Sequence, residues 1–153
     1  MRGPNGASGG ESDSARCFLA CLEEQDGLCR ALEALADTLP SCVDTRAADR
    51  LAGQLRDALL QCHQLEEAVV FPAILGADVM QQPIIDRLRL EHIEDEDSAD
   101  EVCDAMEALA MKQNREDTED TALRMRCLFM SLRRHCAFDR DYVLPLFLQA
   151  CRA

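Results

Sequence analysis

The sequence has no tryptophan, a single tyrosine and only 4% aromatic residues among its 153 positions. Strands favour aromatic and β-branched side chains, so this composition argues against a fold built on sheets. No apolar run is long enough to cross a bilayer, and we therefore expect no membrane-spanning segment. Leu, Ala, Glu, Asp and Arg dominate the chain, and a hydrophobic content of 48% is sufficient for a buried core. These features together favour a single helical domain.

Positive charge is also scarce: 29 Asp and Glu residues outnumber 16 Lys and Arg residues, which gives a formal net charge of -13. Such a field repels nucleic-acid phosphates and anionic membrane surfaces, so we expect neither as a partner. It attracts cations instead. Acidity alone is weak evidence for a metal site, because most acidic side chains only keep a surface solvated.

Residues 1–13 are rich in Gly and Ser and contain no apolar stretch, which predicts a disordered tail rather than a signal peptide. Residues 14–153 are then the folded domain, and the expected compartment is the cytoplasm. The nine cysteines include no Cys-x-x-Cys pair, which argues against a zinc ribbon or a thioredoxin-type site. In a reducing compartment we expect thiols, most of them packed like small hydrophobic residues.

Apolar residues recur at steps of three and four along most of the chain, which is the period of an amphipathic helix. The breaks in this pattern coincide with Pro40 and Gly76, and Pro83 suits the first turn of a new helix. We predict four helices: three over residues 14–39, 44–74 and 83–114, and a fourth that begins at Asp117 or Thr118 and ends near Cys151. Short connections make consecutive helices antiparallel neighbours, so the expected fold is an all-α, up-down four-helix bundle.

The same periodicity predicts which side chains the first and last helices bury. The first helix should bury Phe18, Cys21, Leu28, Leu32, Leu35 and Leu39. The last helix should bury Leu128, Leu132, Tyr142 and Leu146.

Each of the four stripes contains a polar position, and these positions fall at roughly one level of the bundle. They are Gln25 in the first helix, His63 and Glu66 in the second, His92 with Asp95 or Glu96 in the third, and His135 with Asp139 in the fourth. Burying such groups without partners costs several kcal/mol each, and all three histidines of the chain are involved. A shared cation is the simplest way to satisfy buried imidazoles and carboxylates together.

The spacing of these residues supports a metal site. Residues four apart lie on the same helix face, one turn from each other. Three pairs have this spacing: His63 with Glu67, His92 with Glu96, and His135 with Asp139. Imidazole combined with carboxylate suits iron, manganese or zinc rather than calcium or magnesium.

Two other acidic or metal-binding motifs do not fit. A ferritin-like site needs Glu three residues before His, and the residues in that position here are Leu60, Arg89 and Leu132. An EF-hand loop beginning at Asp95 would need Gly at its sixth position, which is Asp100.

The second and fourth helices contain similar segments. Glu66 precedes Val70-Phe71-Pro72, and Asp139 precedes Val143-Leu144-Pro145 at the same spacing. Two similar helical hairpins related by a pseudo-twofold axis would explain this repeat. The Glu-Glu-x-x-x-Phe-Pro stretch at 66–72, the Glu-His pair at 91–92, and the His-x-x-x-Asp followed by Leu-Pro over 135–145 resemble the hemerythrin-like family, the HHE cation-binding domains.

The resemblance implies an up-down four-helix bundle with a non-haem di-iron site, held mostly by histidines together with a pair of carboxylates. Members of the family bind dioxygen or nitric oxide, sense iron or oxygen, or help to repair iron–sulfur centres. Glu66, His92, His135 and Asp139 match the family's ligand positions. Three positions depart from them: Gln25, Cys62 (with His63 one residue along) and Glu96 replace histidines.

We therefore expect a non-haem iron-binding protein that binds or senses iron, dioxygen or nitric oxide, with one or two ions, and rank manganese and zinc below iron. The expected ligands are His63, Glu66, Glu67, His92, Glu96, His135 and Asp139. Gln25 is expected to hydrogen-bond a ligand or a bound water, and Cys62 to be a packed thiol, with thiolate ligation as the alternative. Two other hypotheses stay open: a degenerate, metal-free bundle that binds a protein partner, and a di-iron oxidase or peroxidase.

Overall fold

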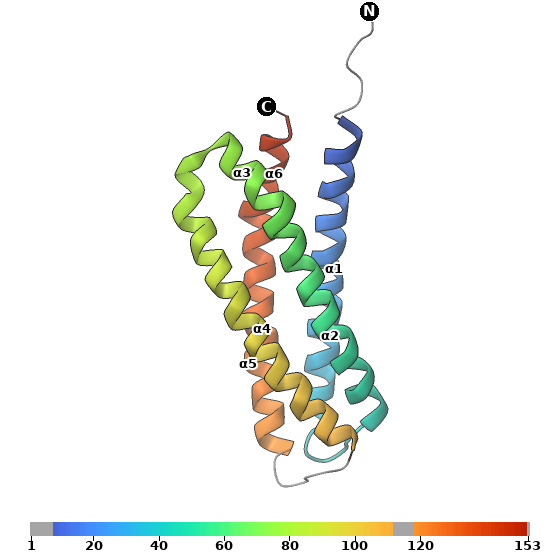
Figure 1. The fold of residues 1–153 in the computed structure, drawn as a ribbon. Helices are drawn as coiled ribbons and strands as arrows, with labels where there is room; N and C mark the ends of the chain where they lie inside the picture. The colour runs from blue at the N-terminus through green and yellow to red at the C-terminus, as the bar shows by residue number, and fades with distance from the viewer. Residues whose placement is uncertain (1–7, 112–117, 153) are drawn as a thin grey trace, which may run out of the picture.

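A computed structural model of the chain describes residues 8–111 and 118–152, which form an antiparallel bundle of four helical arms (Figure 1). The first arm is α1 (Ser8–Thr38). The second consists of α2 (Thr45–Leu65), the π-helical turn η1 (Glu66–Val70) and α3 (Phe71–Ala77). The third consists of the short 3₁₀ turn η2 (Val79–Gln81) and α4 (Gln82–Ala110), and the fourth of α5 (Thr118–Phe138), the π-helical turn η3 (Asp139–Val143) and α6 (Leu144–Ala150).

The prediction of an all-α, up-down bundle is confirmed, and the described residues contain no strand. α1 packs against α2 and α5, and α4 packs against the same two helices, so the four arms enclose a single central core. The arms alternate in direction, and α3 and α6 lie side by side at the end of the bundle that holds the C-terminus (Figure 1).

The helix boundaries follow local signals in the sequence. The Asp44 side chain accepts a hydrogen bond from the Ala47 N–H (3.0 Å) and caps α2, and Pro83 lies in the first turn of α4. α1 begins at Ser8, earlier than the predicted start at Ser14, so part of the predicted tail is helical. The Ser14 hydroxyl donates to the Gly10 carbonyl (3.1 Å), and α1 contacts α6. Residues 1–7, and the predicted boundaries at 114 and 117, lie outside the described residues.

The core consists of two apolar clusters with a polar layer between them. The larger cluster fills the end of the bundle away from the C-terminus and includes Leu32, Leu55, Met106, Leu128 and Leu132. The smaller cluster fills the other end and includes Phe18, Leu22, Phe71, Ile85 and Phe147. Each fully buried side chain of this size stabilises the fold by about 1.5–3 kcal/mol. The two clusters therefore hold the arms in register on both sides of the polar layer.

The predicted core stripes of the first and last helices agree with the structure except at one position in α1 and around the π-helical turn of the last arm. In α1, Cys21 is half-buried and Leu22 takes its place in the core. In the last arm, Tyr142 and Leu146 are half-buried, whereas Val143 and Phe147 are buried. A π-helical turn holds more residues than an α-helical turn, so it shifts the buried face by one position. A constant α-helical period could not predict this shift.

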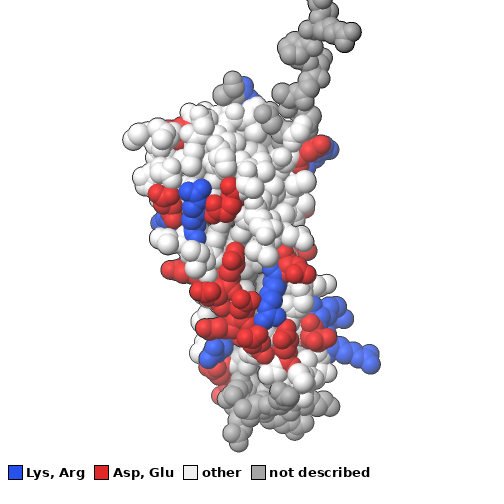
Figure 2. Space-filling view, in the orientation of Figure 1, with Lys and Arg blue, Asp and Glu red and all other residues white. Residues whose placement is uncertain are grey.

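Charged side chains gather on the face formed by α2 and α4 (Figure 2). There Arg56 of α2 bonds to three acidic residues of α4: Asp100 (2.9 Å), Asp104 (2.6 Å) and Glu107 (2.7 Å). These contacts are largely exposed, so each contributes little to stability. They agree with the expectation that most acidic side chains of this chain keep its surface solvated.

Four of the nine cysteines (Cys29, Cys62, Cys103 and Cys136) are buried, as expected for packed thiols, whereas Cys17, Cys42 and Cys127 are exposed. Among the described helices, none has both the length and the apolar composition that a membrane crossing requires.

We expect Leu128→Ala to lower the free energy of unfolding by about 2–5 kcal/mol, because Leu128 is only 2% exposed and its removal leaves a cavity in the larger cluster. Urea unfolding followed by circular dichroism measures this change. Leu123→Ala, on the same helix but 58% exposed, is the matched control and should change stability by less than about 0.5 kcal/mol. Equal effects of the two substitutions would contradict the packing described.

Candidate metal site

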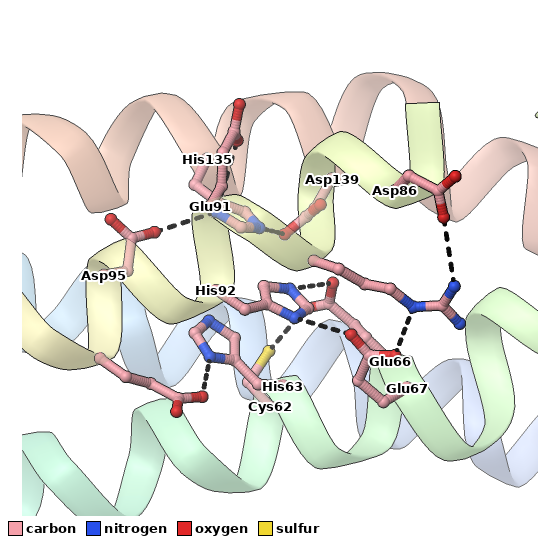
Figure 3. Close-up of polar contacts among 12 residues, drawn as sticks. Cys62, His63, Glu66, Glu67, Asp86, Glu91, His92, Asp95, His135 and Asp139 are labelled. Carbon is pink, nitrogen blue, oxygen red and sulfur yellow. Dashed lines mark hydrogen bonds and ion pairs between the residues drawn. The ribbon is translucent and has the colours of Figure 1, made fainter. Parts of the chain in front are cut away.

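The polar layer collects buried side chains from all four arms. Its buried members are Gln25, His63, Glu66, His92, Asp95, His135 and Asp139. Figure 3 shows His92 and His135 near each other between the arms, with the carboxylates of Glu66 and Asp139 beside them. All three histidines of the chain thus lie at one level of the bundle, as their positions in the stripes predict.

Three residues form the most compact group of ligand atoms. One atom each from Glu66, His92 and His135 lies within 4.8 Å of the other two. The Nε2 atom of His92 is 3.1 Å from Oε2 of Glu66, and the Nε2 atom of His135 is 3.4 Å from Oδ2 of Asp139. Two imidazoles and the carboxylate of Glu66 therefore converge, and the carboxylate of Asp139 lies beside His135.

The two carboxylates occupy equivalent positions on the backbone. Glu66 is the first residue of η1 and Asp139 is the first residue of η3. The Phe71 N–H donates to the carbonyl of Glu66, and the Leu144 N–H donates to the carbonyl of Asp139, which is the i→i+5 bonding of a π-helical turn. The sequence repeat is therefore also a repeat of local structure.

The prolines that follow explain why both turns are wide. Pro72 and Pro145 each lack an N–H, and a proline ring in a regular α-helix collides with the carbonyl four residues before it. A π-helical turn immediately before the proline relieves this collision. Such turns are frequent at functional sites, and here both begin at a carboxylate of the polar layer.

His135 is oriented by a carboxylate on the side away from the centre. Its Nδ1 atom donates to Oδ2 of Asp95 (3.0 Å), and Ser131 donates to the other oxygen of Asp95 (2.9 Å). Because a carboxylate only accepts hydrogen bonds, this contact places the proton on Nδ1. In the neutral imidazole the lone pair on Nε2 would face Glu66 and Asp139, which is the arrangement found in metal-binding histidines.

The other two histidines also have a carboxylate near Nδ1. Nδ1 of His63 is 2.7 Å from Oε1 of Glu96. Nδ1 of His92 is 3.4 Å from Oε1 of Glu67, whose other oxygen accepts a hydrogen bond from Arg89 (2.8 Å). Glu67 and Glu96 therefore lie on the outer side of the imidazoles rather than among the converging atoms.

The imidazole rings are stacked nearly parallel. The ring centroids of His63 and His92 are 3.8 Å apart with an interplanar angle of 13°, and those of His92 and His135 are 5.2 Å apart at 12°. The ring of Phe71 lies parallel to His92 at 5.6 Å. This stack restricts rotation of His92 and keeps its Nε2 atom directed at Glu66.

Burial makes the two central carboxylates hard to ionise. It raises the pKa of Glu66 to about 7 and, together with the nearby charge of Glu66, raises the pKa of Asp139 to about 8. Two such groups in a low-dielectric layer disfavour each other's negative charge. A cation between them would remove this penalty and favour both carboxylates in their ionised form.

The pKa values of the three imidazoles differ because the charged groups around them differ. Burial lowers the pKa of His63 to about 4, and burial followed by the charge of His135 lowers the pKa of His92. Burial also lowers the pKa of His135, but the hydrogen bond to Asp95 and the charges of Asp139 and Glu66 outweigh it and raise the pKa to about 9. Without a metal ion, His135 is therefore the cation of this layer.

Three buried polar atoms have no hydrogen-bond partner among the described residues: Nδ1 of His92, Nε2 of His135 and Oδ1 of Asp139. Leaving such an atom unsatisfied costs about 1–3 kcal/mol. A cation bound at the centre would satisfy the atoms of His135 and Asp139 together. The residues present thus fit a metal ion by donor type, by convergence and by these unsatisfied atoms.

Gln25 and Cys62, which replace histidines of the family pattern, contact neighbours inside the layer. The Cys136 thiol donates to the side-chain oxygen of Gln25 (3.2 Å), and the Cys62 thiol donates to Oε1 of Glu66 (3.4 Å). A hydrogen bond with Cys21, followed by burial, raises the pKa of Cys62, so this side chain is a neutral thiol that holds Glu66. These contacts favour the packed-thiol interpretation of Cys62.

Sequence reasoning left Asp95 and Glu96 as alternatives, and the structure places them on different histidines. Asp95 contacts His135, whereas Glu96 contacts His63. The roles of Ser131 and Arg89 were not predicted. Ser131 precedes His135 by one helical turn, which is a usable signal, but the contact of Arg89 with Glu67 joins separate arms and has no local pattern.

Comparison with known families agrees with this geometry. The profile of the hemerythrin HHE cation-binding domain matches residues 23–147, which is most of the chain, and the chain therefore belongs to this family. The matched segment contains every residue of the polar layer, and membership of a cation-binding family indicates metal binding. No curated protein and no solved structure gives a significant match to the chain.

We expect the metal-free protein to lose stability as the pH rises from about 6.5 to 9. The folded-state pKa of His135 is about 9, above the value of about 6.5 for an unfolded imidazole. Its contribution to the free energy of unfolding is therefore complete below about pH 6.5 and is lost as the pH rises through about 9. The raised pKa of Asp139, about 8, acts with the same sign. Urea unfolding with a chelator at several pH values measures the trend, and His135→Gln should flatten it. A rise in stability over this range would contradict the proton assignment.

Proposed function

We propose that this chain binds one non-haem iron ion through Glu66, His92, His135 and Asp139, and serves as an iron-dependent binder or sensor of dioxygen or nitric oxide. The observation that carries the proposal is the convergence of Glu66, His92 and His135 within 4.8 Å, in a layer that contains unsatisfied buried ligand atoms. A metal-free bundle would have to bear the cost of these atoms without compensation.

The donor set favours iron among the metals that suit nitrogen and oxygen ligands. Two histidines with carboxylate, and positions left open to small molecules, are typical of non-haem ferrous sites. Structural zinc sites usually combine thiolate and imidazole in a closed tetrahedron, and the thiol of Cys62 is neutral and bonded to Glu66. Manganese has similar ligand preferences to iron and is ranked second.

A single ion is favoured over a pair of ions because the other predicted ligands already bond to protein side chains. His63 and Glu96 bond to each other, and Glu67 bonds to Arg89. In this proposal Asp95 accepts the hydrogen bond from Nδ1 of His135 and so keeps the proton on that atom. Glu67 lies near Nδ1 of His92 on the corresponding outer side. Bound ferrous iron would supply a redox-active centre with affinity for dioxygen or nitric oxide. The two apolar clusters would limit the access of bulk water to it.

The location and partners of the protein stay predictions from composition. We place it in the cytoplasm, and the net charge of -13 argues against nucleic acid as a partner.

Anaerobic reconstitution with ferrous iron, followed by gel filtration and metal analysis, tests the proposal. We expect one iron per chain in the wild type, a change in the visible spectrum when nitric oxide is added, and loss of stoichiometric iron in His135→Gln. His63→Gln is the matched control and should retain the iron. Absence of bound iron in the wild type would overturn the proposal, and two irons per chain with loss in both variants would replace it with a two-metal site.

Asp95→Asn should weaken iron binding roughly 10–100-fold, because the neutral amide no longer holds His135 in the required tautomer and orientation. Competition with a chelator of known affinity measures the change. Asp97→Asn, at an exposed position of the same helix, controls for the loss of one negative charge and should bind iron like the wild type. Equal losses in the two variants would show that Asp95 acts only through overall charge.

A further inference from the structure

A groove follows the seam between α4 and α5 and reaches the ring of His135. It consists of two adjacent cavities with volumes of about 250 and 350 Å³. Both cavities are lined by Arg87, Glu91, Arg134 and His135, so they meet at this group of residues. The groove is therefore a route from the surface to the edge of the polar layer.

The two ends of the groove differ in character. The smaller cavity is completed by the apolar residues Ile84, Leu88 and Phe138. The larger cavity is completed by the polar residues Glu94, Asp95 and Ser131. The Phe138 ring is held against Tyr142, with ring centroids 5.1 Å apart, and gives the apolar end a fixed aromatic wall.

The shared middle of the groove contains an arginine without an acidic partner. Nε of Arg87 pairs with Oε1 of Glu91 (2.9 Å), so this arginine has an acidic partner. Arg134 makes no ion pair or hydrogen bond with any described residue, whereas its neighbour Arg133 pairs with Glu33 (2.5 Å). Within the part of the chain that the structure describes, Arg134 therefore presents a free guanidinium beside the apolar cavity.

We infer that this groove binds a small organic monoanion, with its carboxylate at Arg134 and a short apolar body against Ile84, Leu88 and Phe138. A guanidinium binds carboxylate in a planar, charge-assisted contact. The acidic residues Glu94 and Asp95 at the other end would repel a second negative group, so the groove selects against dianions. A cavity of about 250 Å³ lies near the lower limit of ligand pockets, which restricts the ligand to a small molecule.

The ligand would lie beside His135. The statement that it lies next to a metal ion rests on the proposed function. The residues that would contact the ligand directly, Arg134, Ile84, Leu88 and Phe138, are not metal ligands in that proposal. The two inferences can therefore fail separately, and the experiment includes a metal-free arm for this reason.

Calorimetric titration of metal-free and iron-loaded protein with octanoate, suberate and octylamine tests the inference. We expect octanoate to bind metal-free wild type more tightly than the dicarboxylate or the amine. Arg134→Gln should weaken octanoate binding roughly three- to tenfold, as expected for one charge-assisted contact at a partly exposed site. Arg50→Gln, at an exposed position of α2, is the matched control and should leave binding unchanged.

Amide and methyl NMR shifts of the wild type give a second measurement that needs no variant. Octanoate should perturb Ile84, Leu88 and Phe138 before residues of other arms. Binding to the metal-free protein with this pattern supports the groove even if no iron is retained. Binding that occurs only after iron loading and is unchanged in Arg134→Gln would mean that the carboxylate ligates the metal alone, and would overturn the inference. Preference for octylamine, or no binding in either arm, would overturn it as well.

Discussion

The burial of imidazoles and carboxylates at mid-height in a helical bundle is the constraint on which the rest of this structure depends. These groups are costly to remove from water, and two apolar clusters hold them there from either side. Hydrogen bonds to Asp95 and Glu96 offset part of the cost. The rest of this desolvation cost comes from buried atoms without hydrogen-bond partners among the described residues, and a bound cation would stabilise such atoms.

The backbone is adapted to this layer as well as the side chains. Both π-helical turns begin at a central carboxylate and end just before a proline. The proline makes a regular turn unfavourable, and the wide turn alters which side chains face inward on the C-terminal side. As a result Val143 and Phe147 close the core beyond Asp139. The π-helical turn of the last arm thus begins at a candidate ligand, and the residues that follow it pack into the core at that end of the bundle.

The sequence was sufficient to predict the four helices, their directions and the level at which polar side chains enter the core. Glu66, His92, His135 and Asp139 could be singled out because each interrupts an apolar stripe within its own helix. The choice between Asp95 and Glu96 could not be made, since adjacent residues on a helix differ by 100° and both border the seam. Contacts between arms, such as Arg89 with Glu67 and the groove at Arg134, depend on rotations of whole helices and leave no periodic signal.

The positions that depart from the family's ligand pattern contact neighbours inside the layer. Gln25 and Cys62 bond to Cys136 and Glu66, so each replaced position is already satisfied by a neighbour. His63 and Glu96 satisfy each other in the same way. Nε2 of His135 and Oδ1 of Asp139 have no such partner among the described residues, and the groove reaches His135. Loss of histidines has therefore not left the replaced positions unsatisfied, whereas His135 and Asp139 retain unsatisfied atoms that can ligate a metal ion.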